Sequence, residues 1–167
     1  MGSAHDDWPA WLAAHGAALV LFARQWVPAA ADAEDVVQEA FVRFWRARHR
    51  AEDPTAFLYT CVRRCALDWL RGRSRRAARE QAAARPEADP DALFTTAPER
   101  DERRAAVEAA LGRLPAEQRA VLVLKVWGEL TFAQIAAALE VPLNTAASRY
   151  RYALEKLRAL LTEAHVP

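Results

Sequence analysis

The chain of 167 residues is poor in glycine and cysteine and has no long apolar run. With only five glycines it has few easy sites for tight reversals, whereas the good helix formers Ala, Leu, Arg and Glu abound. We therefore predict an all-α fold. No apolar run approaches the ~18 residues of a membrane span, and no basic segment with a long apolar stretch opens the chain as a secretory signal would. The expected location is cytoplasmic.

The scarcity of cysteine and histidine argues against a metal site. Two cysteines cannot supply the four ligands of a structural zinc site, and Cys61 and Cys65 share the apolar face of a predicted helix, which favours a place in the core. The four histidines are scattered, and the chain lacks Ser/His/Asp, metal-ligand and phosphate-loop patterns. We expect no catalytic residue, no metal and no cofactor, and we do not expect an enzyme.

Charge is unevenly distributed behind a formal net charge of +1. Residues 1–42 carry one arginine and six acids, whereas residues 43–79 carry eleven arginines and three acids. Such segregation predicts more than one surface partner.

Capping residues and prolines predict seven helices and one domain boundary. The expected caps are Asp7, Asp32, Asp53 and Thr131. The helices are expected at about residues 8–27, 32–50, 54–79, 99–112, 115–127, 131–139 and 143–163. Gly128 is expected to stop the fifth helix. Prolines and acids gather between residues 83 and 100, which predicts a linker between a domain of residues 1–82 and a domain of residues 101–167.

The C-terminal part of the chain has the pattern of a helix-turn-helix, with a short helix, a turn at Val141-Pro142 and a longer helix. The outer face of the longer helix carries Thr145, Ser148, Tyr152 and Lys156, with Arg149 at its edge. Small hydroxyl residues followed by bases and a tyrosine suit entry into the DNA major groove. A plain helical hairpin is the alternative, which the capping box of Thr131 and Gln134 makes less favourable.

The helix expected over residues 54–79 has one apolar and one basic face. Its expected core stripe is Leu58, Cys61, Val62, Cys65, Ala66 and Trp69. Six arginines lie between residues 63 and 76, where Asp68 is the only acid, and Thr60 is expected beside Arg64 on the polar side. Such a face suits contacts to phosphates and stacking on bases. A solvated arginine-rich face is the alternative.

The helix expected over residues 32–50 is also two-sided. Its predicted buried face is Val37, Ala40, Phe41, Phe44 and Trp45. Its polar side carries Asp32, Asp35, Gln38 and Glu39. These polar side chains suit either a docking surface for a basic or helical partner or the outside of a bundle helix, and spacing alone leaves both interpretations open.

Taken in order, these motifs resemble those of an extracytoplasmic-function (ECF) sigma factor of the bacterial sigma-70 family, over about residues 10–79 and 105–161. Residues 32–45 are similar to the D-A-E-D-x-x-Q-E-x-F pattern of region 2. Residues 57–71 are similar to the helix that recognises the minus-ten element. Residues 114–122 and 130–136 are similar to region 4, which binds the minus-thirty-five element.

The resemblance implies a fold of two small helical domains, a sigma factor function, and three partners: RNA polymerase core, promoter DNA and an anti-sigma factor. It implies that polymerase is bound by Asp32, Asp35, Gln38 and Glu39. It implies that minus-ten DNA is bound by Arg64, Asp68, Arg71, Arg75 and Arg76. It implies that minus-thirty-five DNA is bound by Thr145, Ser148, Arg149, Tyr152 and Lys156.

Three positions depart from the family pattern. Family members usually carry Asn where Arg64 stands, Lys where Ala147 stands and Arg where Tyr152 stands. We therefore expect a different minus-ten preference and a weaker or shifted minus-thirty-five contact. The alternative functions are a sigma-like adapter that binds an anti-sigma factor without engaging promoters, and a self-standing helix-turn-helix repressor. The relative placement of the two domains cannot be derived from the sequence.

Overall fold

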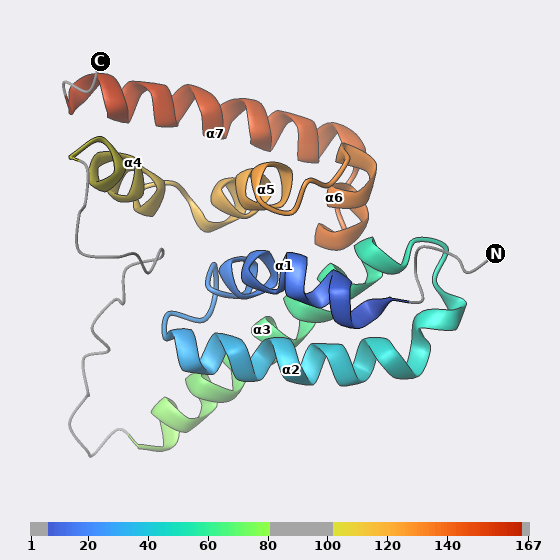
Figure 1. The fold of residues 1–167 in the computed structure, drawn as a ribbon. Coiled ribbons are helices and arrows are strands. Elements are labelled where there is room, and N and C mark those ends of the chain that lie inside the picture. The colour runs from blue at the N-terminus through green and yellow to red at the C-terminus, as the bar shows by residue number, and fades with distance from the viewer. Residues whose placement is uncertain (1–6, 81–101, 165–167) are drawn as a thin grey trace.

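The computed structural model describes residues 7–80 and 102–164, and within these ranges the chain is all-α, as predicted. The helices are α1 (Trp8–Ala23), α2 (Ala30–Ala47), the 3-10 turn η1 (Arg48–Arg50), α3 (Pro54–Arg79), α4 (Glu102–Gly112), α5 (Ala116–Val126), α6 (Phe132–Leu139) and α7 (Leu143–Glu163). They form two layers, α1 to α3 and α4 to α7, which lie against each other (Figure 1). The linker expected at residues 83–100 lies outside the described residues.

The helix starts follow the predicted caps, with one exception. The carboxylates of Asp7 and Asp53 accept hydrogen bonds from the backbone amides of Ala10 and Ala56, and Thr131 forms a complete capping box with its α6 partner. The prediction for Asp32 is wrong, because α2 begins two residues earlier and has no side-chain cap. Asp32 instead lies in the first turn, where the positive end of the helix dipole stabilises its negative charge.

The end of α5 differs from the prediction in mechanism. Gly128 has no positive φ; the left-handed residue of this turn is Glu129, with φ 55°. Gly128 is buried, and a Cβ at this position would lie 2.7 Å from the carbonyl oxygen of Leu124 and 3.2 Å from the hydroxyl of Tyr59. Glycine is therefore required mainly because this turn packs tightly against the Leu124 carbonyl of α5, with Tyr59 of α3 close beside it.

One hydrophobic core extends through both layers. From the first layer it includes Phe22 and Tyr59, whose rings meet edge to face, and from the second it includes Leu124, Ile135 and Leu139. A smaller cluster joins α4, α5 and α7. The α4–α7 layer therefore depends on the first layer for part of its burial.

The predicted core stripe of α3 is confirmed. Its members are buried apart from Trp69, which is half-buried, and Cys61 and Cys65 are free thiols inside the core. Thr60 was expected on the polar side, but it is buried because α6 covers it. Among the described residues, no helix is both long and apolar enough to cross a membrane.

Candidate functional site

The exposed side of α2 carries the predicted carboxylates. Asp35, Gln38 and Glu39 are exposed, and Asp32 is half-buried. Glu39 pairs with Arg43 one turn further along the helix. Three of the four predicted docking residues are thus available to a partner on one helix face.

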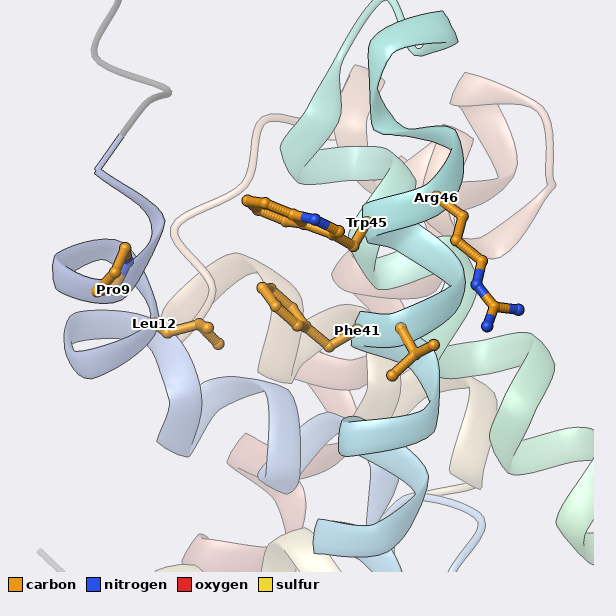
Figure 2. A pocket seen from close by; sticks show the side chains of 6 residues that line it. Pro9, Leu12, Phe41, Trp45 and Arg46 are labelled. Carbon is orange, nitrogen blue, oxygen red and sulfur yellow. The ribbon is translucent and has the colours of Figure 1, made fainter.

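An apolar hollow of about 490 Å³ lies between α1 and α2, next to these carboxylates. Its lining is Pro9, Leu12, Phe41, Val42, Trp45 and Arg46. Figure 2 shows Pro9 and Leu12 of α1 facing Phe41 and Trp45 across it. The predicted burial of Trp45 is wrong: the side chain is 44% exposed, because α1 leaves the mouth of the hollow open. Val42 and Trp45 thus leave apolar surface exposed to solvent beside the hollow.

The C-terminal half of α3 presents the predicted arginines. Arg71, Arg75 and Arg76 are exposed. Asp68 lies between two arginines. Its carboxylate accepts from Arg43 of α2 at 3.1 Å and from Arg71 of α3 at 3.3 Å. Arg43 and Asp68 therefore fix the base of a cationic face whose outer arginines remain open to solvent.

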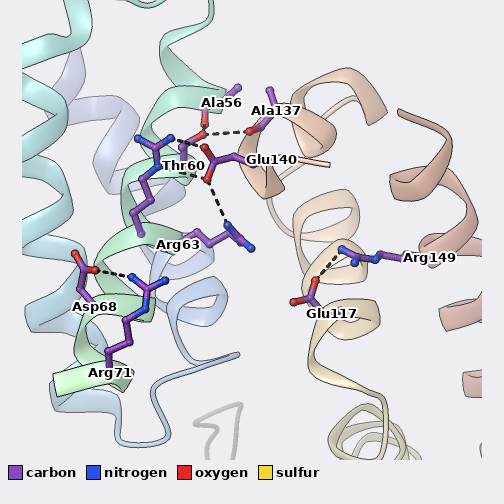
Figure 3. A network of polar contacts seen from close by, with 10 residues as sticks. Ala56, Thr60, Arg63, Asp68, Arg71, Glu117, Ala137, Glu140 and Arg149 are labelled. Atoms are coloured by element: carbon purple, nitrogen blue, oxygen red, sulfur yellow. Dashed lines mark hydrogen bonds and ion pairs between the residues drawn. The ribbon is translucent and has the colours of Figure 1, made fainter. Parts of the chain in front are cut away.

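Arg64 differs from the other predicted arginines of α3, because its guanidinium forms an ion pair with an acid of the α4–α7 layer. Its guanidinium pairs with Glu140, which also accepts from Arg63 at 3.4 Å (Figure 3). Glu140 ends α6 in the left-handed conformation, with φ 56°, and so lies in the turn of the helix-turn-helix. The Arg64 guanidinium holds the pKa of the Glu140 carboxyl below its ordinary value, and Glu140 raises the pKa of Arg64.

The outer face of α7 is only partly open. Tyr152 and Lys156 are exposed, whereas Thr145 and Ser148 are half-buried, and the Ser148 hydroxyl donates to the Thr145 carbonyl oxygen at 3.1 Å. Arg149 is half-buried and donates to the Glu117 carboxylate of α5 at 2.7 Å (Figure 3).

Leu154 adds exposed apolar surface to α7, because its side chain is 42% exposed. Sequence reasoning missed three partners of the predicted site: Glu117, Glu140 and the apolar hollow. The acids are visible in the sequence, but their pairing with Arg149 and Arg64 depends on how helices meet in space. The hollow could have been found from Val42, which stands on the exposed arc of α2 with Asp35 and Gln38.

An arginine-faced helix, a helix-turn-helix and a carboxylate-faced helix are together typical of a nucleic-acid-binding protein that also docks on another protein. Comparison with known families refines this class. Residues 11–76 match the family model Sigma-70 region 2, and residues 104–157 match Sigma-70, region 4. The chain is 32% identical to the ECF RNA polymerase sigma factor SigL of Mycobacterium tuberculosis, over 91% of this chain and 87% of that protein. It is 31% identical to the ECF RNA polymerase sigma factor RpoE of Cereibacter sphaeroides, over 77% and 72%.

The chain therefore belongs to the ECF sigma factors of the sigma-70 family. Solved structures agree on the fold. The sigma factor RpoE in a complex with the anti-sigma factor NepR from Bartonella quintana is similar with a TM-score of 0.73 and 23% identity, over 93% of this chain and 97% of that chain. CnrH, in a complex with the cytosolic domain of CnrY, is similar with a TM-score of 0.61 and 30% identity, over 93% and 87%.

Proposed function

We propose that this ECF sigma factor directs core RNA polymerase to specific promoters, with α2 bound to polymerase, α3 holding the opened minus-ten strand and α7 contacting minus-thirty-five DNA. The observation that carries the proposal is that the first layer presents carboxylates on exposed α2 and arginines on exposed α3, two surfaces that meet where Arg43 pairs with both Glu39 and Asp68. The protein acts as an initiation factor, and polymerase supplies the chemistry. Its site of action is then the cytoplasm, where its partners work.

We assign the polymerase-docking surface to Asp35, Gln38 and Glu39, with Asp32 at its edge, and extend it to the apolar hollow. Val42 and Trp45 are 49% and 44% exposed and lie one to two turns beyond the carboxylates. Carboxylates beside apolar surface suit a helical partner that carries basic side chains around an apolar anchor. We propose that this helical partner is part of core polymerase.

The DNA-binding assignment rests on charge and exposure. Opened DNA offers phosphates and unstacked bases, which exposed arginines and aromatic rings hold. On α3 the open cations are Arg71, Arg75 and Arg76, with Arg73 over the ring of Trp69 at 5.5 Å. On α7 the exposed side chains are Tyr152 and Lys156, with Thr145, Ser148 and Arg149 behind them.

Residues 1–82 and 101–167 serve as the two working domains in this proposal, with residues 83–100 as the linker. An anti-sigma factor is the proposed regulatory partner, because the similar sigma factor RpoE was solved with one. No observation of the structure favours the adapter or the repressor.

Reconstitution tests the function. The purified protein is mixed with core RNA polymerase and a promoter library, and run-off transcripts are sequenced. We expect transcripts that depend on this protein and share two upstream elements. Reversal of charge in Asp35→Lys and Glu39→Lys should abolish copurification with core polymerase, whereas Glu34→Lys, an exposed acid on the same helix, should retain it. Transcription that is absent with the wild-type protein would overturn the proposal.

A further inference from the structure

The two layers are joined by polar contacts at the turn of the helix-turn-helix. Glu140 accepts from Arg63 and Arg64, and the Thr60 hydroxyl donates to the Ala137 carbonyl oxygen at 3.4 Å. Figure 3 shows Thr60, Arg63, Ala137 and Glu140 close together. One turn away, the cap of α3 meets the cap of α6. Gln134 donates its side-chain amide to Asp53 at 2.9 Å.

Beneath these contacts lies apolar surface that both layers share, but the fit is incomplete. Tyr59 reaches Gly128 of the second layer, and its buried hydroxyl has no hydrogen-bond partner among the described protein groups. The buried Nε of Arg63 is likewise without a protein acceptor. Buried polar groups without partners cost free energy. The joint is therefore held together by apolar burial and by these polar contacts, and the unpaired polar groups weaken it.

If the proposed function holds, the joined arrangement cannot serve both promoter elements. The names of the minus-ten and minus-thirty-five elements place them about 25 base pairs apart, which is roughly 85 Å at about 3.4 Å per base pair of B-form DNA. In the structure α3 contacts α6 directly, and α7 begins only three residues after Glu140. The layers must therefore separate before α3 and α7 reach their two elements.

We propose that Glu140 is an autoinhibitory latch, occupying Arg64 in place of a DNA phosphate so that single-stranded DNA and the joined arrangement compete for the same guanidinium. The inference rests on the proposed function for the identity of the competing ligand. The carboxylate supplies two oxygens to a guanidinium, as a phosphate does. Arg71, Arg75 and Arg76 remain exposed in the joined arrangement, although Arg71 pairs with Asp68, so DNA can make a first contact there and then displace Glu140.

The test is a charge reversal with a matched control. Glu129 is also an exposed glutamate with left-handed backbone, φ 55°, and it has no polar partner among the described residues. Glu140→Arg and Glu129→Arg therefore change net charge and backbone strain equally. We compare full-length variants by small-angle scattering and by titration with a fluorescein-labelled oligo(dT) strand.

We expect a radius of gyration near that of a compact 167-residue chain, about 15 Å, for the wild type and Glu129→Arg, and a larger average value for Glu140→Arg, in which a greater fraction of molecules has the layers apart. Oligo(dT) affinity should rise about two- to fivefold in Glu140→Arg relative to Glu129→Arg, the range expected from loss of an exposed ion pair. The double variant Arg64→Glu with Glu140→Arg should restore the compact radius.

Equal radii and equal oligo(dT) affinities in Glu140→Arg and Glu129→Arg would overturn the latch. So would a double variant that stays expanded while its circular dichroism remains helical. Wild-type transcription in the reconstitution assay would be unaffected by either result, so failure of the latch is distinguishable from failure of the proposed function.

Discussion

Burial governs the chemistry of the two cysteines on α3. Desolvation raises the pKa of the Cys61 thiol, and it raises the pKa of Cys65 from 9.0 to about 11, although Arg43 lies near enough to oppose the shift. The folded state thus holds these protons more tightly than the unfolded state. The resulting stability is complete below pH 9 and is lost as the pH rises toward 11.

We therefore predict that the urea midpoint of the wild type falls between pH 9 and pH 11, as the pKa of Cys65 requires. The fall should be smaller in Cys65→Ala, measured by circular dichroism at half-unit intervals of pH. Equal falls in the two proteins would show that the Cys65 thiol does not govern the alkaline loss.

Gly128 is a second position where one atom decides the outcome. An added Cβ would lie 2.7 Å from the carbonyl oxygen of Leu124 and 2.9 Å from the Cδ1 of Leu130. Because the first of these is backbone, relief requires the turn to move. We expect Gly128→Ala to lower the free energy of unfolding by about 1–3 kcal/mol in urea titrations.

Gly112→Ala is the matched control for that substitution. A Cβ at Gly112 meets nothing within 4 Å, and its φ is not positive. This change should be neutral or stabilise the protein by about 0.4–1 kcal/mol, through the unfolded chain. Similar losses in both variants would mean that the close approach to the Leu124 carbonyl and to Leu130 does not constrain position 128.

For single helices, the sequence predicted the bounds best where capping residues or a proline turn next to the helix determine its start. α3 runs from Pro54 to Arg79 and α7 from Leu143 to Glu163, as expected, because Asp53 and the Val141-Pro142 turn fix their starts within a few residues. α1 ends at Ala23, earlier than the predicted Val27, although Val27 is fully buried. An apolar residue is buried in the same way in a turn as in a helix, so the apolar pattern alone could not show that α1 ends before Val27.

The recognition helix α7 carries a prediction of its own. Ala147 is half-buried near the N-terminal end of α7, where the family pattern has Lys. Each added phosphate contact steepens the dependence of log affinity on log salt by about 0.9. We expect Ala147→Lys to tighten binding of the polymerase holoenzyme to minus-thirty-five duplex DNA, and to raise the salt slope by that amount.

A gel-shift series from 50 to 200 mM salt, chosen to span the range where such contacts weaken, measures both quantities. Ala159→Lys provides the control, because Ala159 is an exposed alanine near the other end of α7. An unchanged slope in Ala147→Lys would mean that position 147 does not approach DNA phosphate.

For the whole molecule, the sequence identified which faces are apolar but not what covers them. The apolar stripe of α3 was predicted within its own layer, yet Thr60 beside that stripe is buried by α6. The hydrophobic periodicity of a helix shows which of its side chains are buried, but it does not show which other helix buries them. Arg64 was expected to contact minus-ten DNA, and its partner Glu140 stands 76 positions away in the sequence. Their pairing follows only from the way the layers meet.

A shared core has a thermodynamic consequence. Leu124, Ile135 and Leu139 are fully or almost fully buried, in one cluster with Phe22 and Tyr59 of the first layer. If the layers separate, both lose part of this burial, so neither keeps its full stability alone. We therefore predict a single cooperative unfolding transition for the free protein, with equal calorimetric and van't Hoff enthalpies.

Glu140→Arg should weaken this coupling, because it places a third cation beside Arg63 and Arg64. Its calorimetric trace should broaden or divide into two transitions, with the α4–α7 layer melting first since the smaller cluster supports it. Glu129→Arg should keep one transition. Two resolved transitions already in the wild type would mean that the layers fold independently, and that the apolar surface between them contributes little to either.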